Sequence, residues 1–106
     1  MSIGVSTEFI DLTDGEWHVL PSNAINIVFE CEGVAATVTV KTAHTANSKV
    51  HDLGDMHTQG SGNKAHLELE SATHKFVLQN VRVTGLTTDV NGVPLNFAKV
   101  YFGRAK

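Results

Sequence analysis

The stretch that decides the fold is His74-Lys75-Phe76-Val77-Leu78-Gln79-Asn80-Val81-Arg82-Val83-Thr84-Gly85. Its apolar and β-branched residues alternate in a way that excludes a helix and is typical of an extended strand. Phe76 and Leu78 share one face, whereas Val81 and Val83 have the opposite parity. The strand therefore either buries both faces or shifts by one residue near Gln79, and in both cases we expect it to be a central strand.

Residues 24–41 predict two more strands, joined by a tight turn at Glu32-Gly33. Glycine tolerates the positive φ that such a turn requires. A hairpin with this turn would bring the apolar residues of the two strands together in facing pairs: Cys31 with Val34, Phe29 with Ala36, Ile27 with Val38 and Ile25 with Val40. A slip of one residue would send one of these sets to solvent, so the sequence predicts a hairpin with a well-defined register.

Shorter strands are expected over residues 5–12, 16–20, 66–70 and 98–102. Asp14-Gly15 and Pro21-Ser22-Asn23 are turn signals at either end of the second of them. A connection over residues 71–74 would pair the third with the central stretch, setting Leu69 opposite Phe76 and Leu67 opposite Leu78. In the last of them, Val100 and Phe102 lie on one face.

A further hairpin is predicted at Val90-Asn91-Gly92-Val93, because Asn-Gly is the preferred pair for a two-residue type I′ turn. This turn sets Val90 opposite Val93 and Leu86 opposite Phe97. Pro94 has no backbone N–H to donate to a neighbouring strand. Its strand is therefore expected at a sheet edge or at a bulge.

Residues 42–64 differ from the rest of the chain, because they are polar and contain three glycines. Residues 48–53 fit one short strand, and the remainder is typical of an exposed loop. Long loops without secondary structure are uncommon in compact domains and are usually functional or mobile. This exposed segment is where we would first expect a binding contact, and an inert surface excursion is the alternative.

The pattern of about eight short strands separated by turns, without a helix, predicts an all-β fold. We expect an antiparallel β-sandwich or a jelly-roll-like barrel. A chain of 106 residues has room for one two-layer core, so residues 1–106 are expected to form a single domain. Hydrophobic residues make up 42% and charged residues 18%, which argues against a disordered chain.

Charge and cysteine content narrow the functional classes. The formal net charge is −3 and the eight basic residues are scattered, which argues against binding to nucleic acid. No apolar run is long enough to cross a bilayer, and residues 1–5 show no secretory signal. Cys31 is the only cysteine, which excludes an intrachain disulfide and fits folding in a reducing cytoplasm. We expect it to be a small buried or turn residue rather than a nucleophile.

The six histidines invite a search for a metal site: His18, His44, His51, His57, His66 and His74. They form no H-x-H or H-E-x-x-H pattern, and no cysteine pair assists them. Asp52, Asp55 and His57 are close in the sequence with His51 adjacent, so a divalent cation there is one interpretation. Acidic residues near histidines in loops are more often solvated, and a closed site needs three or four convergent ligands. We therefore expect no metal and no other cofactor.

The sequence also indicates no enzyme. It contains no G-x-S-x-G elbow for a nucleophilic serine. Glu68 and Glu70 could form a carboxylate pair, but alternate outward positions on one strand rarely form a cleft. Gly60-Ser61-Gly62 lacks the following helix that would bind a phosphate. Phe76 and Arg82 alone do not make an aromatic and basic surface for nucleic acid. We expect no catalytic residues.

The order of several motifs resembles small β-sandwich modules in the virion proteins of tailed bacteriophages. The motifs are Glu16-Trp17-His18-Val19-Leu20 with Pro21-Ser22-Asn23-Ala24-Ile25, Ala36-Thr37-Val38-Thr39-Val40, a polar glycine-containing excursion, and Phe76 followed by Val81-Arg82-Val83-Thr84-Gly85-Leu86. Together they cover roughly residues 16–86.

This resemblance implies a non-enzymatic structural protein of the virion, foremost a capsid decoration (cement) protein that stabilises the capsid lattice. It further implies that the major capsid protein or another virion protein is the partner. Such proteins are usually homo-oligomers, often trimers. The resemblance offers no catalytic residues, and it implies neither a nucleic-acid nor a membrane partner.

A carbohydrate-binding, lectin-like module is the alternative function, because β-sandwiches commonly host sugar sites. A sugar platform needs exposed aromatic rings. Trp17 and Tyr101 are the candidates beside five phenylalanines. For Trp17, a role as an anchor in or at the rim of the core is the competing interpretation.

Overall fold

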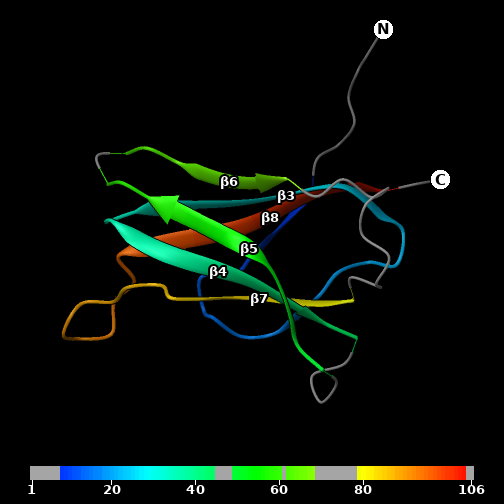
Figure 1. Ribbon diagram of the computed structural model, residues 1–106, viewed down its shortest axis with the longest axis horizontal. Coiled ribbons are helices and arrows are strands. Elements are labelled where there is room, and N and C mark those ends of the chain that lie inside the picture. Colours follow the sequence, from blue (N-terminus) through cyan, green and yellow to red (C-terminus); the bar gives the residue numbers. More distant parts are fainter. Residues whose placement is uncertain (1–7, 45–48, 61, 69–78, 105–106) are drawn as a thin grey trace, which may run out of the picture.

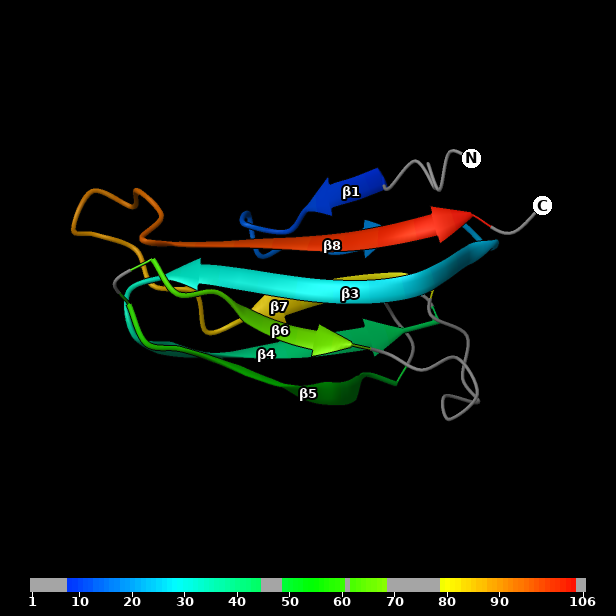
Figure 2. The same cartoon turned by 90° about the horizontal axis from the view of Figure 1, so that it is seen from above.

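A computed structural model describes residues 8–44, 49–60, 62–68 and 79–104 of the chain. These residues form eight strands in two antiparallel four-stranded sheets that pack together (Figures 1 and 2). In chain order the strands are β1 (Glu8–Asp11), β2 (His18–Val19), β3 (Ala24–Gly33), β4 (Ala36–Ala43), β5 (His51–Thr58), β6 (Ala65–Glu68), β7 (Asn80–Thr84) and β8 (Asn96–Arg104). The predicted all-β sandwich is confirmed. No helix within the described ranges is long and apolar enough to cross a membrane.

The first sheet has the strand order β1-β8-β3-β6, and the second has the order β2-β7-β4-β5. Of the strands that follow one another in the sequence, only β4 and β5 are neighbours in one sheet. Every other connection passes from one sheet to the other, which ties the two layers together along their length. β7 lies between β2 and β4, so its predicted central position is confirmed. Phe76 and Leu78 lie outside the described residues.

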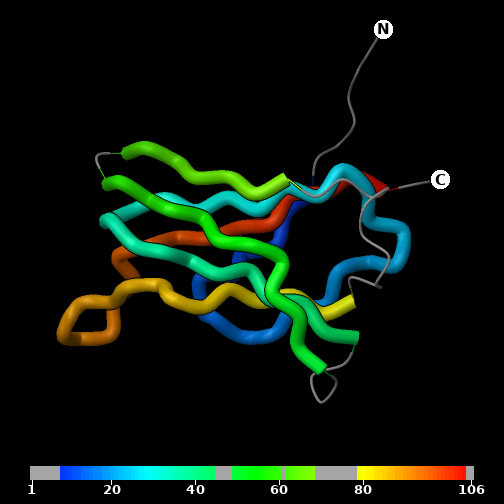
Figure 3. Tube along the Cα trace, in the orientation of Figure 1, coloured from blue at the N-terminus to red at the C-terminus, as the bar shows by residue number. Residues whose placement is uncertain are grey.

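The predicted hairpin within residues 24–41 is wrong, because β3 and β4 lie in different sheets. Phe29 on β3 is opposite Leu67 on β6 and Val100 on β8, not opposite Ala36. Figure 3 shows the chain turning from the end of β3 directly into β4, which belongs to the other sheet. The alternating pattern identifies the apolar face of each strand. It does not distinguish two strands that pair within one sheet from two strands in facing sheets, because both arrangements bury the apolar faces.

The inward faces of the two sheets form one core. Its buried residues come from β3, β4, β5, β7 and β8 and from the positions that directly follow β1 and β2: Leu12, Leu20, Ile27, Phe29, Cys31, Val38, Val40, Met56, Val81, Val83, Ala98, Val100 and Phe102. Val100 and Phe102 are buried on one face of β8, as expected. On β3 the inward alternation begins only at Ile27. Asn26, with φ of 54°, lies where the pairing with β8 shifts register, and Ile25 is left partly exposed.

The structure corrects the interpretation of residues 42–64 as mainly a loop. β4 continues to Ala43, and β5 occupies residues 51–58. Met56 and Thr58 are buried on the inner side of β5, whereas His57 on the same strand is exposed. β5 is an edge strand, and most of its side chains are polar, exposed His and Asp residues among them. An edge strand needs few apolar side chains, so its sequence resembles that of a polar loop.

The predicted two-residue turn at Asn91-Gly92 is also wrong. The Asp89 carbonyl accepts a hydrogen bond from Gly92 N–H, and the Asp89 carboxylate accepts bonds from the N–H groups of Asn91 and Val93. Thr88 is then opposite Pro94, so the register differs by one residue from the prediction. A turn held by an Asp side chain and followed by glycine with positive φ is the three-residue alternative to a type I′ turn.

Smaller predictions have mixed outcomes. Gly15 has a positive φ and bonds back to Leu12, and Ala24 bonds back to Pro21, so both predicted turns are present. The described part of the first strand is Glu8–Asp11, and the second strand is reduced to His18–Val19. In its described part, the strand predicted over residues 66–70 pairs with β3. Its predicted partners at positions 76 and 78 lie outside the described residues.

Gly85 and Gly92 provide a matched pair of substitutions in the connection between β7 and β8. Both have positive φ, but a Cβ at Gly85 would collide with the carbonyl oxygen of Thr37, whereas a Cβ at Gly92 would meet nothing within 4 Å. We expect Gly85→Ala to lower the free energy of unfolding by about 3 kcal/mol or more, and Gly92→Ala by about 1 kcal/mol. Urea unfolding measures both, and equal losses would contradict the packing at Gly85.

Candidate functional site

One end of the sandwich carries a group of exposed apolar side chains. We call this group the apolar end and define it as Val34, Val90, Val93, Leu95 and Phe97. Val34 follows β3, and the other four come from the segment between β7 and β8 and from the start of β8. This segment, coloured orange, projects beyond the ends of the strands in Figures 1 and 2. Val90 is fully exposed, and Phe97 is 47% exposed.

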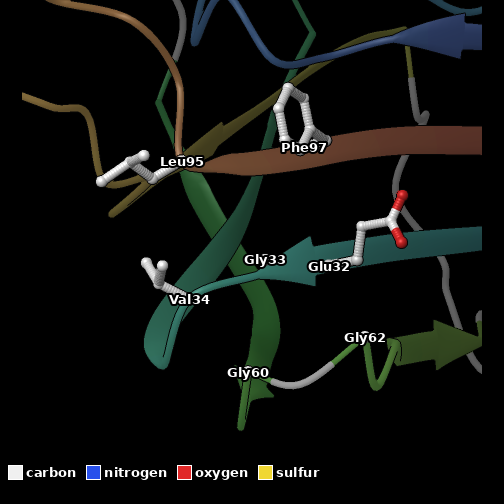
Figure 4. Close-up of a pocket in the computed structure, with 7 residues that line it drawn as sticks. All are labelled: Glu32, Gly33, Val34, Gly60, Gly62, Leu95 and Phe97. Atoms are coloured by element: carbon white, nitrogen blue, oxygen red, sulfur yellow. The ribbon is translucent and has the colours of Figure 1, made fainter.

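Three residues of the apolar end, Val34, Leu95 and Phe97, line an open pocket of about 380 Å³. Its lining residues are Glu32, Gly33, Val34, Gly60, Gly62, Leu95 and Phe97 (Figure 4). Figure 4 shows Val34 and Leu95 pointing to the same side, past the end of β3. Glycines form much of the remaining wall, so the backbone there is open to close approach by a bound group. Glu32, which is directly opposite Phe97 in the pairing of β3 with β8, adds a carboxyl group to the lining.

A buried asparagine holds the two halves of the apolar end together. Asn96 is fully buried, and its side-chain amide donates to the carbonyls of Glu32 and Val34. Its side-chain oxygen accepts a hydrogen bond from the N–H of Thr87. Through Asn96 at the start of β8, these contacts join the end of β3 and the β3–β4 turn to the connection between β7 and β8. The apolar end is therefore a fixed surface rather than two independent loops.

Two further bonds fix Val34. Its N–H donates to the carbonyl of Leu95, at 3.2 Å, and its carbonyl accepts a bond from the buried hydroxyl of Thr58, at 2.6 Å. Gly33 allows this close approach, because a Cβ there would collide with the Leu95 carbonyl oxygen. The sharp turn thus places the Val34 side chain at the surface while its backbone is fully bonded.

A polar cluster lies on the outer face of the first sheet, around Glu30. The side chain of Glu30 is 12% exposed and lies 3.3 Å from Lys64 Nζ and 3.4 Å from His66 Nε2. Burial raises the pKa of Glu30, but hydrogen bonds from Tyr101 and Lys64 and the nearby charge of Lys64 outweigh it. The pKa of Glu30 therefore lies below its ordinary value. The hydrogen bond to Glu30 raises the pKa of Tyr101.

The residues weighed as metal ligands lie along β5, and three of them contact side chains of β4. Asp52 pairs with Lys41 at 2.7 Å, Asp55 accepts a bond from the Thr39 hydroxyl, and His57 bonds to Thr37. Among the described residues no three His, Cys, Asp or Glu side chains are grouped as they would be around a metal ion. His51 lies at the start of the same strand, and His74 lies outside the described part.

The two candidate sugar platforms are in different sheets. Tyr101 is on β8 and packs its ring 5.8 Å from that of Phe9. Trp17 precedes β2 in the other sheet, is half-buried, and has the Arg82 guanidinium 5.5 Å from its ring centroid. One face of the Trp17 ring is therefore occupied, and the two rings do not form a common surface.

Cys31 is buried in the core, as expected. Burial, with the nearby carboxylates of Glu32 and Glu30, raises the pKa of the Cys31 thiol to about 11. The thiol therefore stays protonated at neutral pH and is a poor nucleophile. At the surface, His18 bonds to Asp14, and this hydrogen bond lowers the pKa of Asp14.

Sequence reasoning missed the apolar end, although the sequence contained a signal for it. The parity of Val100 and Phe102 continues backwards to Ala98 and Asn96 as inward positions. By the same alternation, the apolar ring of Phe97 faces solvent and the polar side chain of Asn96 faces the core. Such an inversion of the usual pattern is a sign of a functional surface.

Comparisons of the chain with models of protein families, with curated proteins and with solved structures found no match.

Replacing Asn96 tests whether it supports the apolar end. In Asn96→Ala the N–H of Thr87 and the carbonyl of Val34 lose their buried partner, so we expect the free energy of unfolding to fall by about 2–3 kcal/mol. Asn91→Ala, in the exposed turn, should change it by less than about 0.5 kcal/mol. Similar losses in the two variants, measured by urea unfolding, would contradict the supporting role of Asn96.

The Glu30 cluster predicts a pH-dependent stability difference between the wild type and Glu30→Gln. Because the pKa of Glu30 is lower in the folded protein than in the unfolded chain, the carboxylate stabilises the fold above about pH 4.5. This stabilisation is lost as the pH falls through the folded-state pKa. Lys64 and His66 are half-exposed, so we expect Glu30→Gln to lose only about 0.5–1 kcal/mol at pH 7.

Thermal unfolding of both proteins from pH 3 to pH 7 measures this difference, which should shrink as the pH falls below about 4.5. Glu68→Gln on the neighbouring strand is the control, because Glu68 is exposed. A difference between wild type and Glu30→Gln that grows as the pH falls would contradict the assignment.

Proposed function

We propose that this chain is a non-enzymatic structural protein of a virion, and specifically a capsid decoration protein of a tailed bacteriophage. In this role it binds the major capsid protein or another virion protein and stabilises the lattice. The virion assignment is supported by the resemblance carried by residues 16–86. The attachment role is supported by the exposed apolar end, which is the single observation that carries the proposal.

The apolar end has the properties of an attachment surface. Val34, Leu95 and Phe97 together line a pocket, so they form a contiguous patch rather than scattered apolar residues. Contiguous exposed apolar patches on soluble proteins mark interaction sites. The fixed backbone around Asn96 means that little conformational entropy is lost when a partner binds.

Lattice binding explains how a small surface is sufficient. The apolar end contains five side chains, a small part of the surface that a stable protein interface usually buries. When several copies bind neighbouring sites on a particle, or when a homo-oligomer presents several apolar ends at once, weak contacts multiply. A homo-oligomer, such as a trimer, is therefore part of the proposal.

Mass spectrometry of purified particles tests the proposed function. Particles from the host that produces this chain should contain it at a copy number comparable to that of the major capsid protein or a simple fraction of it. Complete absence from purified particles, with the protein present in the lysate, would overturn the virion assignment. Specific hits on a glycan array would instead favour the carbohydrate-binding alternative.

The role of the apolar end is tested by substitutions on it. We expect Leu95→Ser and Phe97→Ser each to weaken binding to particles that lack the protein by about tenfold. Each substitution removes apolar surface that binding to the particle would bury. Phe9→Ser is the matched control, since Phe9 is exposed to a similar degree but belongs to β1. Binding measured by co-sedimentation that falls equally for Phe9→Ser would contradict the assignment of this surface.

A further inference from the structure

The outer face of the second sheet carries a row of charged side chains across its three longer strands. Arg82 on β7 is directly opposite Lys41 on β4, and Lys41 is directly opposite Asp52 on β5. Trp17 adjoins this row, with Arg82 over its ring. Val81 and Val83 on either side of Arg82 are buried, so the guanidinium group extends from the side of the sheet away from the core.

The charges in this row are not balanced. Like charges directly opposite each other on neighbouring strands destabilise a sheet. Lys41 has a partner, because Asp52 lies 2.7 Å from its Nζ. Among the described residues, the ion pairs include no carboxylate beside Arg82. The folded protein thus holds two cations side by side, and the one anion of the row, Asp52, pairs with Lys41 on the side away from Arg82.

The hydrogen bonds of Arg82 show a second deficit at the same position. Its Nε is buried and has no hydrogen-bond partner, and it is the only such side-chain atom found in the described part of the chain. An unsatisfied buried donor is destabilising, and in a folded protein it needs an explanation. The charge imbalance would be relieved by an acceptor that carries negative charge and binds the terminal nitrogens of the guanidinium.

We propose that Arg82 and Lys41 form a binding site for a carboxylate group. The Trp17 ring holds the guanidinium by a cation–π contact and so orients its planar set of donors before the ligand arrives. A carboxylate accepts two parallel hydrogen bonds from such a fork, and Lys41 adds a second positive charge beside it. Asp52 on the far side of Lys41 limits the site to one anionic group.

The carboxylate comes from an acidic side chain of a protein partner. The row lies on the outer face of a sheet, and β4 and β5 lie at one side of the molecule in Figure 2. Small ligands favour concave, largely apolar pockets, whereas an extended polar face suits the rim of a protein interface. The identity of the partner rests on the proposed function, but the site itself does not.

Nuclear magnetic resonance titration of the whole chain tests this site. The first probe is sodium acetate, and the second is a short blocked peptide with two glutamates, both at constant ionic strength against sodium chloride. We expect saturable shifts of the Trp17 indole N–H and of the Arg82 and Lys41 amides, with the peptide binding more tightly than acetate. The same peptide with glutamines in place of the glutamates should give no saturable shifts.

Arg82→Gln and Lys41→Gln should each weaken binding of the peptide about tenfold, since each removes one charge-assisted contact. The matched control is Arg104→Gln, which removes an exposed arginine from the first sheet, where it pairs with Glu8. The midpoint of thermal unfolding of Arg82→Gln should not fall, because the variant removes a repulsion and an unpaired donor. This result separates a binding role from a structural one.

Three results would overturn the proposal. The first is the absence of saturable shifts up to about 100 mM acetate and with the peptide. The second is equal binding by the wild type and both glutamine variants. The third is equal weakening in Arg104→Gln, which would indicate a general response to net charge. None of these results bears on the apolar end, so the proposed function and this inference fail separately.

Discussion

Face-to-face burial of two apolar sheet surfaces is the constraint on which the rest of this structure depends. Each long strand has only one apolar face, and burying both sets of faces requires that β3 and β4 lie in opposite layers. The chain must therefore cross between the layers within two residues after β3. That crossing requires Gly33, because a side chain there would collide with the backbone of Leu95. The apolar end is a consequence of this crossing.

Polar groups buried at the crossing make the apolar end rigid. Asn96 occupies an inward position on β8 where an apolar residue would otherwise fit, and its described bonds go to backbone groups at the end of β3 and in the two connections. Thr58 does the same from β5. These groups are satisfied, so they stabilise one arrangement of the turns. These bonds fix the backbone of Val34 and Leu95 and keep their side chains exposed to solvent.

The sequence predicted the faces of strands better than their neighbours. Alternation correctly set Val38 and Val40 inward, but it could not distinguish a hairpin partner from a residue in the facing sheet. Met56 was missed as a core residue because exposed His and Asp residues surround it on an edge strand. The turn at Asn91 was misassigned because Asp89 competes for the backbone donors. For the candidate site, Val93 and Phe97 were expected to pair with Val90 and Leu86, whereas the turn at Asp89 shifts this register and both side chains are exposed.

Amide hydrogen exchange, measured on the free protein and on the same protein bound to particles, tests the central claim most directly. If the apolar end is the attachment surface, residues 33–35 and 93–97 should gain protection on binding, while the amides of β1 should be unchanged. Protection that appears on β1 or along the outer face of the first sheet, with none at the apolar end, would contradict the account.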